Sequence, residues 1–181
     1  MLTFIWEKHC WVSTATLLSW AGFQNRTGHY GAIGSRSPSD GTVRIVFAPE
    51  GRGGESLNRD ERRLINHFMD KEPEISQSLL TNLVDEYPGL QDRYGYKGRD
   101  RKELMPDVLV EADLRPLIGL HTVYIHQVSR NGMPYAGYEF GCTWDDEHGL
   151  GILMHGTRPL KIGGADTAFL LWIAKKDAEH G

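Results

Sequence analysis

The sequence has few of the features that mark secreted, membrane or disulfide-stabilised proteins. It contains only two cysteines, Cys10 and Cys142, among 181 residues, and two thiols so far apart suit a reducing compartment better than a disulfide framework. No apolar run reaches the roughly 18 residues that a membrane helix needs. The first residues include Glu7, Lys8 and His9, with no cationic segment ahead of an apolar one, so no signal peptide is expected. These absences predict a cytoplasmic protein with no membrane partner.

An excess of positive charge is also missing. The chain has 20 lysines and arginines against 24 aspartates and glutamates, which gives a net charge of -4. Nucleic acid and anionic membrane surfaces call for clustered Lys and Arg, so neither is expected as the main partner. Hydrophobic residues make up 40% and charged residues 24% of the chain, as in ordinary globular proteins. We expect a single domain over residues 1–181.

Catalytic and cofactor-binding motifs are missing as well. No serine stands in a Gly-x-Ser-x-Gly elbow, and neither cysteine has the surroundings of a catalytic nucleophile. The glycines within 51–54 follow a proline and lack the Lys-Ser/Thr ending of a phosphate-binding loop. We therefore expect no cofactor and favour a protein without enzymatic activity.

What the sequence does contain is the hydrophobic pattern of an α+β fold. Short strand-like runs, including the alternating segment 42–48, predict an antiparallel β-meander over about residues 1–48. A second β-unit, closed by a helix that Asp166 caps, is predicted over about residues 105–178. The predicted architecture is one or more antiparallel β-sheets with a central helix pair and a C-terminal helix.

The central helix pair is predicted over about residues 57–87. Asn58 and Glu61, three residues apart, form a capping-box pattern at the start of the first helix. Pro73 is typical of a first helical turn, so it is expected to begin the second helix, which would end at Pro88. Apolar residues follow helical spacing in both segments.

Two segments of the C-terminal half resemble an uncharacterised family of bacterial domains. They are GYEFGCTWDDEHGLG at residues 137–151 and IGGADTAF at residues 162–169. The resemblance extends back through the predicted helix pair to Trp20. It implies a small single-domain protein of the kind that often sits in bacterial toxin and immunity gene neighbourhoods, and it implies no catalytic residues.

The densest group of reactive side chains lies in a predicted hairpin, between Cys142 and His155. Carboxylates, imidazoles and a thiol so close in sequence can ligate a divalent metal or act as acid and base. An acidic turn beside exposed aromatic residues can instead bind a basic partner. In a third interpretation Asp145 and Asp146 only satisfy turn backbone groups, and Gly149 sets up the return strand.

Two functional hypotheses follow from this hairpin. The preferred one is an immunity-like module that binds a basic protein such as a toxin through Tyr138, Trp144, Asp145, Asp146, Glu147 and His148. The alternative is a metal-assisted hydrolase in which catalysis depends on Asp145, Glu147 and His148. In that alternative the metal ligands are Asp145, His148 and His155.

Overall fold

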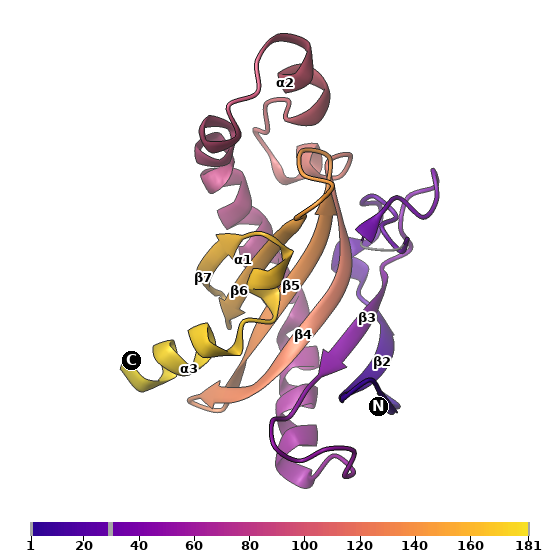
Figure 1. Ribbon diagram of the computed structural model, residues 1–181, viewed down its shortest axis with the longest axis vertical. Helices are drawn as coiled ribbons and strands as arrows, with labels where there is room; N and C mark the ends of the chain where they lie inside the picture. Colours follow the sequence, from indigo (N-terminus) through magenta and orange to yellow (C-terminus); the bar gives the residue numbers. More distant parts are fainter. Residues whose placement is uncertain (1, 29–30, 181) are drawn as a thin grey trace.

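A single seven-stranded sheet organises the computed structural model, which describes residues 2–28 and 31–180 (Figure 1). The strand order across the sheet follows the order along the chain. Every neighbouring pair is antiparallel except β3 and β4, which run parallel. The strands are β1 (Ile5–Glu7), β2 (Cys10–Thr16), β3 (Thr42–Phe47), β4 (Ile118–Arg130), β5 (Met133–Cys142), β6 (Leu150–His155) and β7 (Arg158–Gly163).

The sheet consists of two antiparallel units that share one parallel seam. Strands β1 to β3 form the meander predicted for about residues 1–48, and β4 to β7 form the C-terminal β-unit. At the seam, Ile45 lies opposite Val123 and Phe47 lies opposite Ile125. Parallel neighbours cannot be joined by a tight turn, so the chain leaves β3 and returns to β4 through a long crossover. The helical segment occupies that crossover.

One continuous helix, α1 (Arg59–Tyr94), replaces the predicted helix pair. The predicted capping box is confirmed, because the Asn58 side chain accepts from the Glu61 backbone and the Glu61 side chain accepts from the Asn58 backbone. Pro73 and Pro88 lie inside the helix rather than at its boundaries. An internal proline removes a helical hydrogen bond at a cost of about 3 kcal/mol. A continuous stripe of buried side chains along the helix, from residue 65 to residue 90, offsets that cost.

The sheet has helical cover on both faces. In Figure 1, α1 runs behind the sheet along its length, and α3 (Leu171–His180) lies in front, packed on β4. The C-terminal helix is thus confirmed, but it begins later than predicted, because Asp166 lies in the preceding 3₁₀ helix η4 (Ala165–Ala168). The other helices are α2 (Gly98–Leu104), η1 (Leu18–Trp20) and η3 (Glu111–Leu114). Among residues 2–28 and 31–180, no helix combines the length and apolar character required to cross a membrane.

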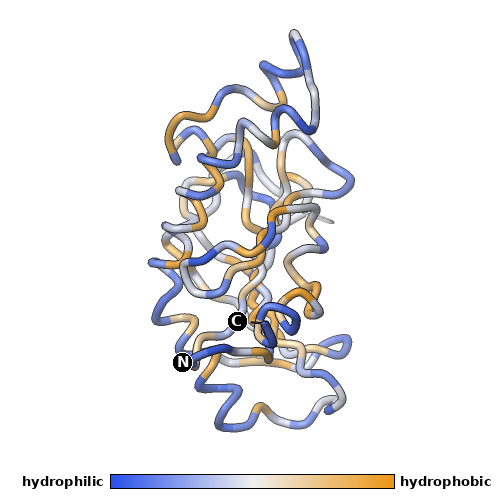
Figure 2. Tube along the Cα trace, turned by 90° about the vertical axis from the view of Figure 1, so that its left-hand side faces the viewer, coloured by the Kyte–Doolittle hydropathy of each residue, from blue (hydrophilic) through white to orange (hydrophobic). Residues whose placement is uncertain are grey.

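The main hydrophobic core fills the space between α1 and the sheet, and a smaller one lies under α3. Figure 2 shows hydrophilic segments at both ends of the long axis and hydrophobic ones concentrated between them. The main core also encloses a polar group: Trp20 Nε1 donates to Ser76 Oγ at 2.9 Å, and Ser76 Oγ donates to the buried carboxylate of Glu72. The smaller core contains Tyr135, Leu153 and Ala174.

Candidate functional site

The turn between β5 and β6 is organised around the carboxylate of Asp145. Its Oδ1 accepts from the His148 backbone N–H at 2.9 Å and lies 3.1 Å from His148 Nδ1, while its Oδ2 accepts from the Tyr94 hydroxyl at 2.9 Å. Burial alone raises the pKa of Asp145, but these donors outweigh burial and hold the pKa below its usual value. Asp145 is therefore an ionised, hydrogen-bonded anchor of the turn.

Two aromatic residues predicted to contact a partner lie in the core instead. Tyr138 is fully buried, and Trp144 is 2% exposed and packs edge-on against Tyr87 with ring centroids 5.7 Å apart. The middle strands of this sheet are covered on both faces, so alternation along β5 does not direct Tyr138 to solvent. Neither aromatic side chain is available to form part of a binding surface in this structure.

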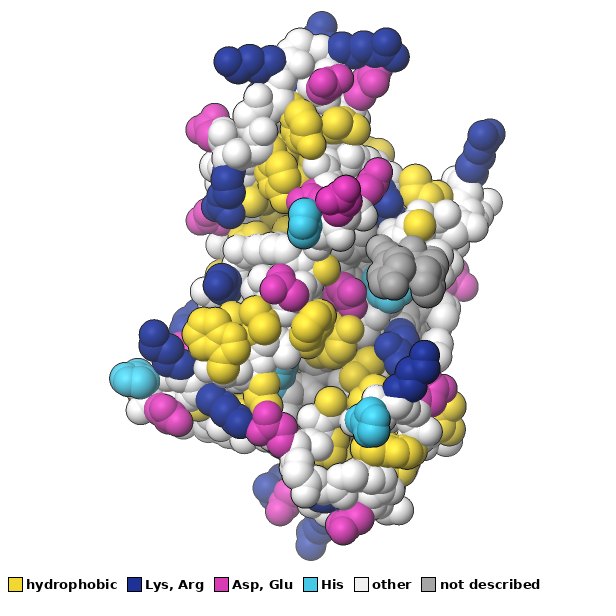
Figure 3. Space-filling model, in the orientation of Figure 1, with side chains coloured by type: hydrophobic (Ala, Val, Ile, Leu, Met, Phe, Trp, Pro, Cys, Tyr) yellow, Lys and Arg dark blue, Asp and Glu magenta, His cyan; other side chains and the backbone are white. Residues whose placement is uncertain are grey.

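The predicted residues that do reach solvent are Asp146, Glu147 and His148. The side chains of Asp146 and His148 are 86% and 73% exposed, and Glu147 is also exposed. In Figure 3, acidic side chains group beside a histidine over the turn between β5 and β6, below α2. We call these three residues the acidic turn. Their side chains are therefore accessible to solvent, and the binding role of these residues stays a prediction.

A cleft of about 540 Å³ opens beside the acidic turn. Its walls come from the turn, from the end of α2, from Arg26 and from residues 31–33; they include Cys142, Thr143, Asp145 and Asp146. Burial raises the pKa of the Cys142 thiol to about 12, so this cysteine is neutral at physiological pH, and its Sγ donates to the Asp145 carbonyl. A protonated, buried thiol of this kind is a poor nucleophile.

Arg26 forms part of the floor of the cleft. It is 5% exposed, and its Nε donates to Gln24 Oε1 at 2.8 Å. Its Nη1 donates to the Gly31 carbonyl and lies 3.9 Å from Asp146 Oδ1. Burial lowers the pKa of Arg26, and Asp146 opposes that effect. No local sequence pattern marks Arg26 as part of this site, because it lies far from the acidic turn in the chain.

The alternative metal ligands are not brought together. His155 lies at the opposite end of β6 from the acidic turn, and five strand residues span about 16 Å. Its Nε2 lies 3.1 Å from the Arg130 carbonyl, and its ring stacks on Tyr135 with centroids 4.5 Å apart. Across residues 2–28 and 31–180, no group of three or more His, Cys, Asp or Glu side chains is placed to hold a metal ion.

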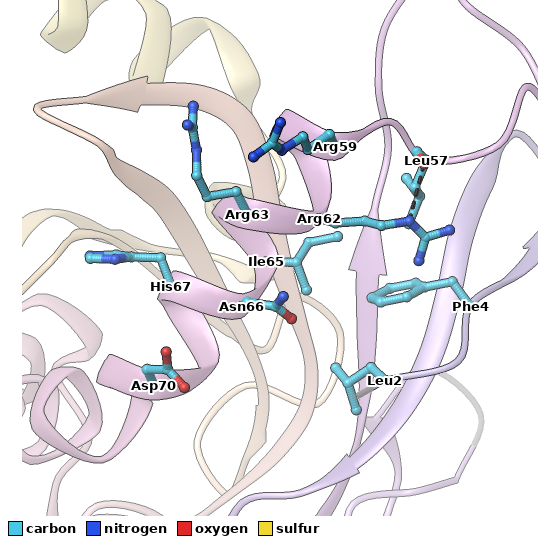
Figure 4. Close-up of a pocket in the computed structure, with 10 residues that line it drawn as sticks. All are labelled: Leu2, Phe4, Leu57, Arg59, Arg62, Arg63, Ile65, Asn66, His67 and Asp70. Carbon is cyan, nitrogen blue, oxygen red and sulfur yellow. Dashed lines mark hydrogen bonds between the residues drawn. The ribbon is translucent and has the colours of Figure 1, made fainter.

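A second and larger cavity, of about 700 Å³, lies at the start of α1 (Figure 4). Leu2 and Phe4 form one side of it, and α1 forms the other. The helix contributes three arginines to its lining, Arg59, Arg62 and Arg63. Sequence reasoning missed this cavity. The segment RDERR contains three arginines, but their position across from the first residues of the chain depends on the tertiary fold.

Comparison with known proteins places the chain in a family. The searches of curated proteins and of solved structures found no match. A family model described as a domain of unknown function, DUF6985, matches residues 29–170. That span includes β3 to β7, α1 and the acidic turn. The expectation of an uncharacterised domain family is thereby confirmed, and the chain belongs to the family of domain of unknown function DUF6985.

Proposed function

We propose that this protein is a non-enzymatic binding module that docks a positively charged segment of a partner protein on the acidic turn. The observation that carries the proposal is the exposure of Asp146 and Glu147 beside the cleft. Glu147 makes no ion pair or hydrogen bond with any other residue in the described part of the chain. The Glu147 carboxylate is therefore available to pair with a cationic group of a partner.

The rigidity of the turn supports a binding role. Asp145 accepts hydrogen bonds from His148 in the same turn and from Tyr94 at the end of α1. The neighbouring Trp144 carbonyl accepts from the Tyr96 hydroxyl at 2.8 Å. A surface that is already ordered before binding loses little conformational entropy when the partner docks. Exposed carboxylates at the edge of such a surface accelerate encounter with a cationic partner and select against anionic ones.

An immunity-like role is the specific form of this proposal. The C-terminal segments resemble bacterial domains that often sit beside toxin genes, and toxins that act on nucleic acids need a cationic surface to bind phosphates. The acidic turn has the charge that complements such a surface. A bacterial, cytoplasmic protein that neutralises a basic toxin fits both the charge and the family resemblance.

Binding of an arginine-rich peptide tests the charge preference of the acidic turn. We expect the double variant Asp146→Asn, Glu147→Gln to bind a ten-residue oligoarginine about tenfold more weakly than the wild type at low salt. The matched control is Asp85→Asn, Glu86→Gln, which removes an exposed acidic pair from the solvent side of α1. Equal losses in the two double variants would mean that the peptide senses only net charge, and would contradict the proposal.

A metal-assisted hydrolase is the second candidate, and one observation favours it. The Asp145 carboxylate lies 3.1 Å from His148 Nδ1, an arrangement that orients the imidazole of a side chain that is 73% exposed. Elemental analysis of the purified protein separates the two candidates. Stoichiometric metal that is lost in the Asp145→Ala, His148→Ala variant would support the hydrolase and count against a purely binding role.

A further inference from the structure

We infer that the cavity at the start of α1 is a binding site for a small anionic molecule with an apolar chain, such as a carboxylate carried on a hydrocarbon tail. This site lies on other elements than the acidic turn and selects the opposite charge. The inference rests on an apolar wall, a cationic rim and a volume suited to a small ligand.

The apolar wall connects the cavity to the main core. Ile65 and Leu57 are 2% and 5% exposed and belong to that core, while Leu2 and Phe4 are partly buried and pack against it. In Figure 4, Leu2 and Phe4 face the helix across the cavity. A hydrocarbon chain inserted here would exchange water for contacts with four apolar side chains.

The cationic rim comes from the first turns of α1. Arg62 is oriented toward Phe4 by a hydrogen bond of 3.1 Å from its Nε to the Leu57 carbonyl, which leaves its terminal nitrogens available (Figure 4). The side chain of Arg59 has no ion-pair or hydrogen-bond partner among the residues that the structure describes. Arg63 pairs with Asp60 at 3.1 Å, but both side chains are more than three-quarters exposed, so the pair is weak.

Nearby carboxylates do not cancel this positive charge. Glu61 is already occupied, because Arg52 Nη2 and the Asn58 backbone N–H both donate to its Oε2 at 2.7 Å. Asp70 also lines the cavity, but its single negative charge is outnumbered by the positive charges of three arginines. The positive end of the α1 dipole adds to the attraction for an anion. The arginines of the rim therefore favour anionic ligands at this cavity, although the chain as a whole has a net charge of -4.

The volume agrees with a small-molecule ligand. Ligand pockets typically measure about 300–1,000 Å³ and combine apolar walls with a few polar groups that fix orientation. The cavity of about 700 Å³ at the start of α1 has this composition. The tail would lie against Phe4 and Leu2, and the anionic head would lie between Arg59 and Arg62.

Calorimetric titration with three probes of equal chain length tests the inference. We expect octanoate to bind at least tenfold more tightly than octylammonium and at least fivefold more tightly than octanol. The variant Arg59→Gln, Arg62→Gln is expected to lose at least fivefold in affinity for octanoate and to keep its affinity for octanol. The variant Leu2→Asn is expected to weaken both. Arg59→Gln alone, at an exposed position, serves if the double variant does not fold.

The matched control is Arg93→Gln, Arg99→Gln, which removes two exposed arginines near the other end of α1 and is expected to bind octanoate like the wild type. Equal binding of octanoate and octanol, an equal loss in the control, or no octanoate binding at millimolar concentration would overturn the inference. The variant Asp146→Asn, Glu147→Gln should still bind octanoate, which separates this site from the acidic turn.

Discussion

Tyr94 and Asp145, 51 positions apart in the sequence, are joined by a hydrogen bond of 2.9 Å from the tyrosine hydroxyl to Oδ2. This bond ties the last residue of α1 to the turn between β5 and β6. Tyr96 reinforces it by donating to the Trp144 carbonyl, and the two tyrosine rings stack nearly parallel, 6.2 Å apart. The long helix therefore sets the position of the proposed binding turn directly.

Removal of the Tyr94 hydroxyl should destabilise the fold in a pH-dependent way. We expect Tyr94→Phe to lower the free energy of unfolding by about 1–2 kcal/mol at neutral pH, because an ionised acceptor loses a donor. The pKa of Asp145 is lower in the folded state than in the unfolded chain, so its ionised form stabilises the fold. The difference should be complete above about pH 5 and should shrink as the pH falls below about 4.

Urea unfolding at several pH values measures this effect. Tyr96→Phe is the matched control, because it removes a hydroxyl that donates to a backbone carbonyl, which does not titrate. Its cost should stay constant over the same pH range. A constant cost for Tyr94→Phe as well would show that Asp145 does not couple to the bond.

The buried polar group beneath α1 should be sensitive to loss of its central hydroxyl. Ser76→Ala leaves Trp20 Nε1 without an acceptor and leaves Glu72 with only the Ser19 hydroxyl as a side-chain donor, and we expect a loss of about 1–3 kcal/mol in the free energy of unfolding. Glu72→Gln keeps an acceptor for Ser76 and removes a buried charge that no cation pairs with in the described part of the chain. The free energy of unfolding of Glu72→Gln should be close to that of the wild type. A Glu72→Gln variant as unstable as Ser76→Ala would show that the charge itself is required.

An unpaired hydroxyl in the core offers an opportunity to stabilise the protein. The Tyr87 hydroxyl is buried and has no hydrogen-bond partner among residues 2–28 and 31–180. We expect Tyr87→Phe to raise the free energy of unfolding by up to about 1 kcal/mol, because a buried polar group without a partner costs free energy. Thermal unfolding measures the change. A clear fall in melting temperature would mean that the hydroxyl is hydrogen-bonded in solution.

Two glycines should respond in opposite ways to an added methyl group. A Cβ at Gly89, exposed in α1, meets no atom within 4 Å, whereas a Cβ at Gly137 in β5 would overlap the Ala168 carbonyl oxygen. We expect Gly89→Ala to stabilise the helix by about 0.5–1 kcal/mol. Gly137→Ala should displace η4 and destabilise the fold severely. Similar melting temperatures for the two variants would contradict the close approach of η4 to β5.

The strands and the start of α1 were predictable because the relevant signals are local. Alternating apolar residues define β3, and the capping box is contained within Asn58 to Glu61. The continuity of α1 was not predictable from local rules. Pro73 is read as a helix start by its propensity, but packing of the whole helix on the sheet overrides that preference.

The candidate site was predictable only in part, for a related reason. The exposure of Asp146 and Glu147 follows from a turn rich in acidic residues. The burial of Trp144 and the role of Tyr94 depend on α1 returning to the end of the sheet, which no local pattern shows. The cavity at the start of α1 depends in the same way on Leu2 meeting a helix more than fifty positions later.

The parallel seam between β3 and β4 has a consequence for how the chain folds. Each antiparallel unit is built from neighbours in sequence, whereas the seam pairs Phe47 with Ile125 across the whole length of α1. Contacts between distant segments form slowly, since closing a long loop costs entropy before any pairing is gained. The two antiparallel units are therefore expected to form first, and the pairing of β3 with β4 is expected to follow later. Until it closes, β3 and β4 remain open edges on which two nascent chains can pair with each other.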